Sequence, residues 1–358
     1  MANPVKNLQR TAAEYKMMDS KDKRRFWTDG ILNNALYILM VVFIVYTAVK
    51  VPQFLGAGSI VNIVSLAASS LPIALGIGGC IVLTGTDLSA GRVVGLSAAI
   101  SAALLQSTEI SRRMFPNMPE MPIIVAILAV MVVGAIIGAV NGFFVAKFSL
   151  HPFIVTLATQ LITYGTILLF FMVNGNNGQP LSGLSDKYKN FVTGPLFKIG
   201  NNVTVPRYVL YAFLMVAVMW FIWNKTTFGK NMFAVGSNAE AAKVSGVNVF
   251  KTTILVHTLA GVMYGLTGFI EAPRISSITQ GTGLNYECDA IAACVIGGVS
   301  FVGGTGKISG IVLGVFILRI IFAALTFLGV DANMVYIIKG LIILVACSLD
   351  MRKYLVKK

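Results

Sequence analysis

The stretch Asn224–Val249, NKTTFGKNMFAVGSNAEAAKVSGVNV, separates two long hydrophobic halves of the chain. Ser237 and Glu240 have the spacing of a capping box, in which a hydroxyl and a carboxylate accept from each other's backbone amides at a helix start. We therefore expect a helix to begin at Ser237. Gly246 follows at the distance of a glycine cap, which ends a helix in the left-handed conformation. The sequence thus predicts one short helix inside a polar loop, 224–250.

A helix of about two turns is marginal when it stands alone in water. Its small side chains suggest that it docks into a partner through an alanine face made of Ala239, Ala241 and Ala242. An ordinary solvated loop helix is the alternative interpretation.

The composition indicates an integral membrane protein. Of 358 residues, 56% are hydrophobic and only 12% are charged, which is too apolar for a soluble domain of this size. The net charge of +14 could suggest nucleic acid, but the 28 basic residues are dispersed and no zinc-ligand spacing accompanies them. We therefore expect no nucleic-acid partner. The four cysteines show no paired motif.

Ten apolar stretches predict an all-α polytopic membrane protein with about ten transmembrane helices. The stretches are 31–49, 60–83, 93–107, 122–146, 153–173, 207–223, 253–270, 290–302, 308–328 and 334–349. They form one transmembrane domain, 31–350, between an N-terminal segment, 1–30, and a tail, 351–358. The N-terminal segment is basic and lacks the features of a cleaved signal peptide. If it is cytoplasmic, most Lys and Arg residues fall on the cytoplasmic side, so the positive-inside rule predicts that both termini are cytoplasmic.

The third and eighth stretches are too short to cross as straight helices, and each adjoins a glycine-rich break. The breaks are GTDLSAG at Gly85–Gly91 and GGVSFVGGTG at Gly297–Gly306. The similar triplets CIV (80–82) and CVI (294–296) precede them, which suggests an internal repeat. Non-helical backbone survives at membrane depth only where protein or a water-filled cavity satisfies it. Paired breaks therefore point to a substrate path, with close helix packing as the alternative. The expected break glycines are Gly85, Gly91, Gly297, Gly298, Gly303 and Gly304.

Polar residues near a break or inside a span are our candidates for the translocation path: Asp87, Ser89 and Asn141. A charge inside a span is costly, so Arg319 is expected to pair with a carboxylate or with backbone carbonyls. Lys339 lies near an outer boundary and is expected to extend towards the headgroups.

No motif for ATP binding, metal binding or catalysis occurs. A phosphate-binding loop would need a glycine where Phe301 stands before Gly306 and Lys307, so this chain is not expected to bind ATP. His151 and His257 are far apart, without cysteines or carboxylates at metal-ligand spacing. We expect no metal, no cofactor and no catalytic residue, and therefore no enzyme.

The segment 174–205 is the longest expected on the outer side, and it is rich in Asn, Gly and Ser. It fits a lid or a docking surface. A disordered connector is the alternative, because glycine and asparagine clusters mark loops of every kind.

Four motifs in order carry a family resemblance: GTDLSAGR at 85–92, PFIVTLAT at 152–159, FGKNMFAVGSNAEAAKVSGVNV at 228–249 and YECDAIAACVIGGVSFVGGTGKISG at 286–310. With the spans between them, the chain resembles the membrane permeases of bacterial ABC importers for monosaccharides, the family of ribose, xylose and galactose permeases. The first and third motifs favour the branch for galactose and methyl galactoside.

The resemblance implies a role for the central loop. The family's EAA-x-x-x-G signature is matched by Glu240, Ala241, Ala242 and Gly246. The resemblance thus implies that this helix, with Ser237 and Asn238 at its start, is the coupling helix that sits in a cleft of the ATP-hydrolysing subunit. A Leu-Pro pair that follows the signature in many other ABC importers is absent, so their detailed geometry is not expected to transfer.

The resemblance also implies partners and a location. These are a second copy of the chain, a separate ATPase that holds ATP and Mg, a periplasmic or lipid-anchored sugar-binding protein, and the lipid of the bacterial cytoplasmic membrane. Ribose, xylose or a nucleoside is the alternative substrate. An ion-coupled secondary transporter is a more distant alternative, disfavoured because most carboxylates lie at span ends or in loops.

Overall fold

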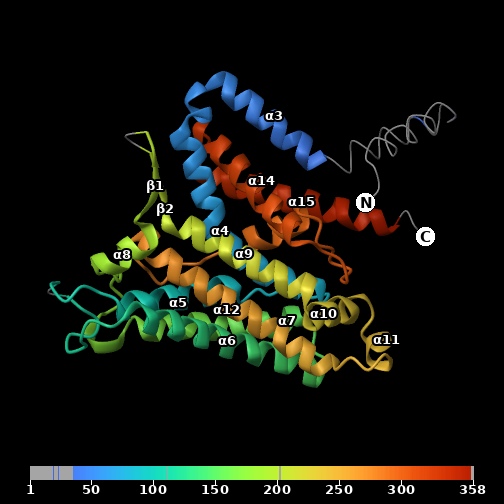
Figure 1. The fold of residues 1–358 in the computed structure, drawn as a ribbon, viewed down its shortest axis with the longest axis horizontal. Helices are drawn as coiled ribbons and strands as arrows, with labels where there is room; N and C mark the ends of the chain where they lie inside the picture. Colours follow the sequence, from blue (N-terminus) through green and yellow to red (C-terminus); the bar gives the residue numbers. More distant parts are fainter. Residues whose placement is uncertain (1–18, 20–22, 24–34, 111, 201–202, 356–358) are drawn as a thin grey trace.

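The computed structural model describes residues 19, 23, 35–110, 112–200 and 203–355. Within these ranges the chain is a bundle of helices with one small hairpin (Figure 1). The longer helices are α3 (Ala35–Lys50), α4 (Ala57–Val82), α5 (Ala90–Leu104), α6 (Ile123–Phe148), α7 (Pro152–Phe170), α9 (Arg207–Lys225), α12 (Val249–Ile275), α13 (Tyr286–Ile296), α14 (Ile308–Phe327) and α15 (Ala332–Leu355). Apart from residues 19 and 23, the expected cytoplasmic segment 1–30 lies outside the described residues, and α15 continues into the expected tail.

Every expected span overlaps one of these helices, and the chain is a multi-pass membrane protein. By length and hydropathy, six of the described helices could each cross a membrane: α4, α6, α7, α9, α12 and α14. The two spans expected to be broken are the short helices α5 and α13, with 15 and 11 residues. The predicted extension of the eighth span beyond Ile296 is wrong, because the chain leaves the helix at the second glycine break.

The centre of the bundle is α12, which packs against α4, α5 and α6. Its close contact with α6 depends on glycine. A side chain on Gly134 would collide with the carbonyl oxygen of Gly261, and one on Gly261 with that of Gly134. In lipid, burying apolar side chains does not drive helices together. Small residues instead let the helix backbones approach closely, and this packing stabilises the pair. Glycine within these spans therefore serves helix packing.

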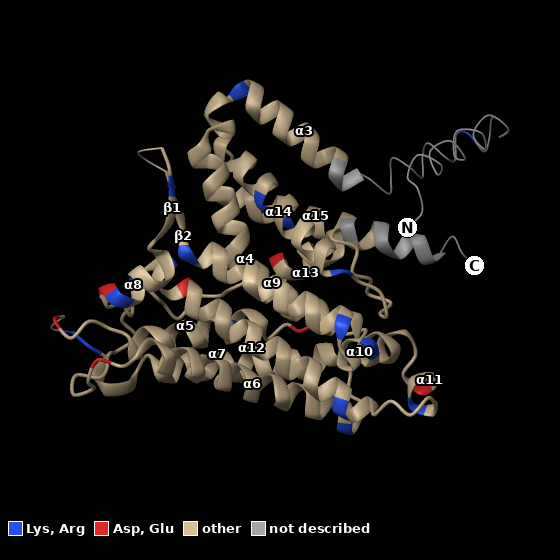
Figure 2. Cartoon of the chain, viewed as in Figure 1, with Lys and Arg blue, Asp and Glu red and all other residues tan. Residues whose placement is uncertain are grey.

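The two ends of the bundle differ in structure. At one end lie α8 (Asp186–Thr193) and the hairpin of β1 (Pro195–Ile199) and β2 (Val203–Pro206), and at the other lie α10 (Thr227–Ser237) and α11 (Ala239–Val244) (Figure 1). Charged residues gather at both ends and are sparse between them (Figure 2). This distribution fits a bundle whose middle lies in lipid.

The interpretation of 174–205 as a disordered connector is wrong for its described part. Besides the hairpin and α8, this segment contributes Tyr188 to the core. The Tyr188 hydroxyl donates to the carbonyl of Phe269 at 2.6 Å and lies 3.1 Å from the Ser101 hydroxyl. Burial raises the pKa of Tyr188. Because a buried hydroxyl needs such partners, α8 is held firmly against α5 and α12.

The capping-box prediction at Ser237 is wrong. Ser237 is the last residue of α10, a helix that the sequence did not predict, and its hydroxyl donates to Phe233 O at 2.9 Å. Asn238 is extended, with φ −164°, and its side chain accepts from Ala241 N at 2.9 Å. Asn caps a helix as well as Ser does, so the cap moves one residue along. The predicted glycine end is confirmed, since Gly246 has φ +85°.

Candidate functional site

The end of α10 lies against the end of α4 and against the second glycine break. A side chain on Gly236 would collide with the carbonyl oxygen of Val82, the last residue of α4 before the first break. The same oxygen accepts from Gly304 N of the second break at 2.9 Å. A side chain on Gly304 would in turn collide with Ser237. The predicted coupling loop, the end of α4 just before the first break and the second break, far apart in sequence, therefore pack together.

The break glycines serve two purposes. Gly298, Gly303 and Gly304 have φ of +82°, +87° and +65°, a region that strongly favours glycine, so they turn the chain. Gly85 and Gly91 allow neighbouring segments to approach their backbone closely. A side chain at Gly85 would collide with the ring of Pro152, and one at Gly91 with the carboxylate of Glu287. Gly297 lies as closely against Gly310. The expected breaks in the helices are therefore confirmed, and close packing, the alternative considered for these glycines, accounts for part of them, whereas the substrate path stays a prediction.

The surface of α11 differs in part from the expected alanine face. Ala242 is only 5% exposed and faces its own chain. The residues open to a partner are Ala239, Glu240, Ala241, Lys243 and Val244. Val244 is 89% exposed, an unusual position for a branched apolar side chain at the polar end of a membrane protein. Val244 ends the helix beside the charged Glu240 and Lys243, and an apolar contact with a polar rim is the usual arrangement of a protein interface.

The three predicted path residues lie together. Ser89 donates to Asp87 Oδ1 through its backbone N at 3.0 Å and its hydroxyl at 2.6 Å, and Asn141 Nδ2 lies 3.0 Å from Ser89 Oγ. Thr159 of α7 donates to Asn141 Oδ1 at 2.6 Å. Asp87, Ser89 and Asn141 are all fully buried. This network links the first break to α6 and α7, and contact with substrate stays a prediction.

The structure brings together a cluster of potential metal ligands that the sequence did not predict. Cys80 Sγ lies 3.6 Å from His257 Nδ1, and ligand atoms of Cys80, Asp87 and His257 lie within 4.8 Å of one another. They come from α4, the first break and α12, so no spacing in the sequence could reveal them. All three are buried and could hold a metal ion. A thiol-to-imidazole hydrogen bond also accounts for the short contact.

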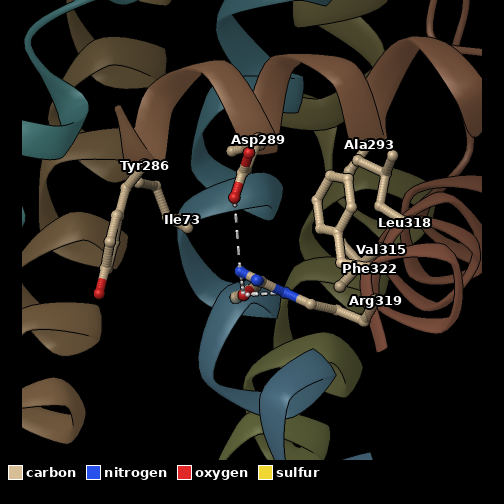
Figure 3. Close-up of a pocket in the computed structure, with 10 residues that line it drawn as sticks. Ile73, Tyr286, Asp289, Ala293, Val315, Leu318, Arg319 and Phe322 are labelled. Atoms are coloured by element: carbon tan, nitrogen blue, oxygen red, sulfur yellow. Dashed lines mark hydrogen bonds and ion pairs between the residues drawn. The ribbon is translucent and has the colours of Figure 1, made fainter. Parts of the chain in front are cut away.

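A second group of charged side chains, partly buried, surrounds Asp289 (Figure 3). Arg319 donates to the Ser70 hydroxyl, with Nε at 3.1 Å, and lies 3.8 Å from the Asp289 carboxylate. This confirms the pairing expected of Arg319. The prediction that Lys339 extends to the headgroups is wrong, because its ammonium lies 3.0 Å from the same carboxylate and 4.6 Å from the centre of the Phe322 ring. One carboxylate thus serves two cations, which lowers the cost of keeping both in an apolar bundle.

Comparisons with known proteins agree with this geometry. Residues 59–347 match the family described as the branched-chain amino acid transport system permease component. The chain belongs to this permease family. It is 44% identical over 330 residues to the galactose/methyl galactoside import permease protein MglC of Haemophilus influenzae, covering 92% of this chain and 97% of that protein. It is 43% identical over 341 residues to MglC of Escherichia coli, covering 95% and 100%.

A more distant relative is the ribose import permease protein RbsC of Escherichia coli, 32% identical over 332 residues, covering 92% of this chain and 97% of that one. No solved structure matches the chain. These relatives are permeases and not enzymes, so the expectation that this chain is no enzyme is confirmed.

Proposed function

We propose that this chain is the membrane permease subunit of an ATP-driven importer of galactose and methyl galactoside. The observation that carries the proposal is the 44% identity to a galactose/methyl galactoside permease along nearly the whole of both chains, against 32% to a ribose permease. Because both comparisons cover 92% of this chain, the difference reflects the whole sequence and not one shared motif.

The exposed surface of α11 is the contact for the ATPase, which binds ATP and Mg in its own chain. Its apolar Val244, flanked by the charged Glu240 and Lys243, supports this assignment. Closure of the ATPase would move α11 and α10. Because Gly236 packs on Val82 and Gly304, that movement would reach the end of α4, which leads into the first break, and the second break.

The α10–α11 end of the bundle is cytoplasmic, and the hairpin end faces the sugar-binding protein. The basic residues that flank the spans support this orientation through the positive-inside rule, which also places both termini in the cytoplasm of a bacterial cell. The second copy of the chain covers α7, whose large apolar side chains Leu157, Leu161 and Ile162 are exposed in one copy. Substrate would cross between the two copies.

Competition for uptake tests the substrate. The experiment uses right-side-out membrane vesicles prepared from spheroplasts. They enclose ATP and contain the permease, its ATPase and its binding protein. Labelled galactose should accumulate, and unlabelled methyl galactoside should compete while ribose should not. Competition by ribose or by a nucleoside with equal strength would contradict the assignment to the galactose branch.

A further inference from the structure

The connection between α12 and α13, Ser276–Asn285, runs back into the bundle without forming a helix. At its outer end Ile278 exchanges backbone hydrogen bonds with Leu181 at 2.8 and 2.9 Å. Five residues later, the α-carbon of Gly283 lies against the carbonyl oxygen of Gly91, where no side chain would fit. Gly91 is in the first turn of α5, whose opposite end is tied to the hairpin end of the bundle by Ser185 N donating to Leu105 O.

The carbonyl oxygen of Thr282 lies as closely against Gly95, one turn further along, so the connection packs beside the first two turns of α5. Its backbone turns sharply, since Ser276, Gly283 and Asn285 have φ of +58°, +83° and +63°. Non-helical backbone at this depth is stable only when it is covered by protein or lines a water-filled space. One side of the connection is covered by α5. The other side must therefore be covered by protein as well, or it must face water.

That other side carries polar side chains. Ser277, Thr279 and Asn285 are exposed, and within the described part of the chain their side chains make no hydrogen bond. Unpaired hydroxyls and amides facing lipid would each cost several kcal/mol. These side chains therefore face water and not lipid.

Arg92 of α5 and Tyr164 of α7 pack against the connection. The Arg92 guanidinium stacks over the Tyr164 ring of α7, with 4.2 Å from its carbon to the ring centre, and donates to the carbonyl oxygen of Gln280 at 3.4 Å. Arg92 is only 9% exposed. It thus joins α5, α7 and the connection while its charge is kept from the open side.

We propose that the hexose is held, during its passage, against Ser276–Asn285, with Ser277, Thr279 and Asn285 hydrogen-bonding its hydroxyls. This inference rests on the proposed function. Two hydroxyls and one amide supply both donors and acceptors, as a neutral polyol requires. None of these three side chains is charged, which suits a neutral sugar. Because only three uncharged groups hold the sugar, binding is weak enough to permit its release.

Single substitutions test these contacts. Thr279→Val, Ser277→Ala and Asn285→Gly each remove one polar group, and glycine keeps the left-handed conformation of position 285. Each should lower the ratio of maximal uptake rate to KM for galactose by about threefold to tenfold. Each variant should lose less with the deoxygalactose that lacks its partner hydroxyl. Thr326→Val is the matched control, because its hydroxyl is exposed and bonds only to its own helix, at Phe322 O. Unchanged ratios in all three variants would overturn the inference.

Thiol labelling provides an independent measurement. In a Cys288→Ser, Cys347→Ser background, Thr279→Cys should react with a charged, water-soluble thiol reagent, and galactose should slow the reaction. No reaction would place the connection against lipid or protein and overturn the inference. The two proposals can be told apart. If the wild-type assembly shows no ATP-driven galactose uptake, the proposed function is wrong. If uptake is normal but the thiol of Thr279→Cys does not react, only the assignment of the connection as a substrate surface is wrong.

Discussion

The α-carbon of Gly236 lies directly against the carbonyl oxygen of Val82, so close that a methyl group could not be placed between them. That oxygen also accepts the hydrogen bond from Gly304 N at 2.9 Å. Three segments, the end of α4, the second break and the end of α10, therefore meet at one backbone atom. A displacement of α10 would therefore act directly on the end of α4 and on the second break.

Gly236→Ala should separate ATP hydrolysis from transport. Overpacking by one methyl group against backbone costs about 1–3 kcal/mol, which is enough to lower coupled uptake about tenfold. ATP hydrolysis by the assembled complex should persist, because the α11 surface is untouched. The measurement is galactose uptake per ATP hydrolysed in proteoliposomes. Gly340→Ala is the control, since no atom lies within 4 Å of the added methyl group, and an equal loss in both variants would contradict the account.

The exposed and buried sides of α11 should respond differently to a carboxylate. Val244→Asp leaves the fold intact, because that side chain is 89% exposed, but should weaken binding to the ATPase. Ala242→Asp instead buries a charge in the chain itself and should lower its thermal stability. Co-purification of the ATPase and thermal unfolding in detergent distinguish the two effects. Full ATPase binding by Val244→Asp would show that α11 is not the contact.

Asn141→Leu should loosen the junction of the first break with α6 and α7. It removes the hydrogen bonds to Ser89 and Thr159, and we expect the free energy of unfolding to fall by about 1–3 kcal/mol. Thermal unfolding in detergent gives the change. Thr166→Val serves as control, because that hydroxyl bonds only to Ile162 of its own helix. If the two substitutions had the same small effect, the network would contribute nothing to stability.

Asp289→Asn should destabilise the chain because Arg319 and Lys339 lose the carboxylate they share. The expected loss is about 1–3 kcal/mol, below that of a fully buried pair because all three side chains keep some exposure. The double variant with Lys339→Met should recover part of it by removing one cation. Thermal unfolding at low and high salt checks this, and a double variant less stable than Asp289→Asn would refute the shared-carboxylate explanation.

The sequence predicts the positions of the apolar helices well because hydrophobic length is a strong signal, and six of the ten expected spans are long enough to cross a membrane. Gly246 as a helix end and the pairing of Arg319 also follow from local rules. The failures have physical causes. Asn238 competes equally with Ser237 for the cap, and α10 lacks the length of a span. Lys339 reaches a carboxylate that lies 50 residues away.

The candidate site depends on contacts that no local pattern contains. The packing of Gly236 on Val82, and the grouping of Cys80, Asp87 and His257, join segments from separate parts of the chain. The sequence makes no prediction for the connection Ser276–Asn285, and its contacts with α5 place it inside the bundle.

The most direct test of the account is galactose accumulation in proteoliposomes that contain the permease, its ATPase and its binding protein. ATP or a non-hydrolysable analogue is enclosed on the α11 side. We predict accumulation above the external concentration with ATP, and none with the analogue. Equal accumulation with the analogue, or accumulation driven by an ion gradient without ATP, would contradict the claim that this chain is a permease moved by an ATPase.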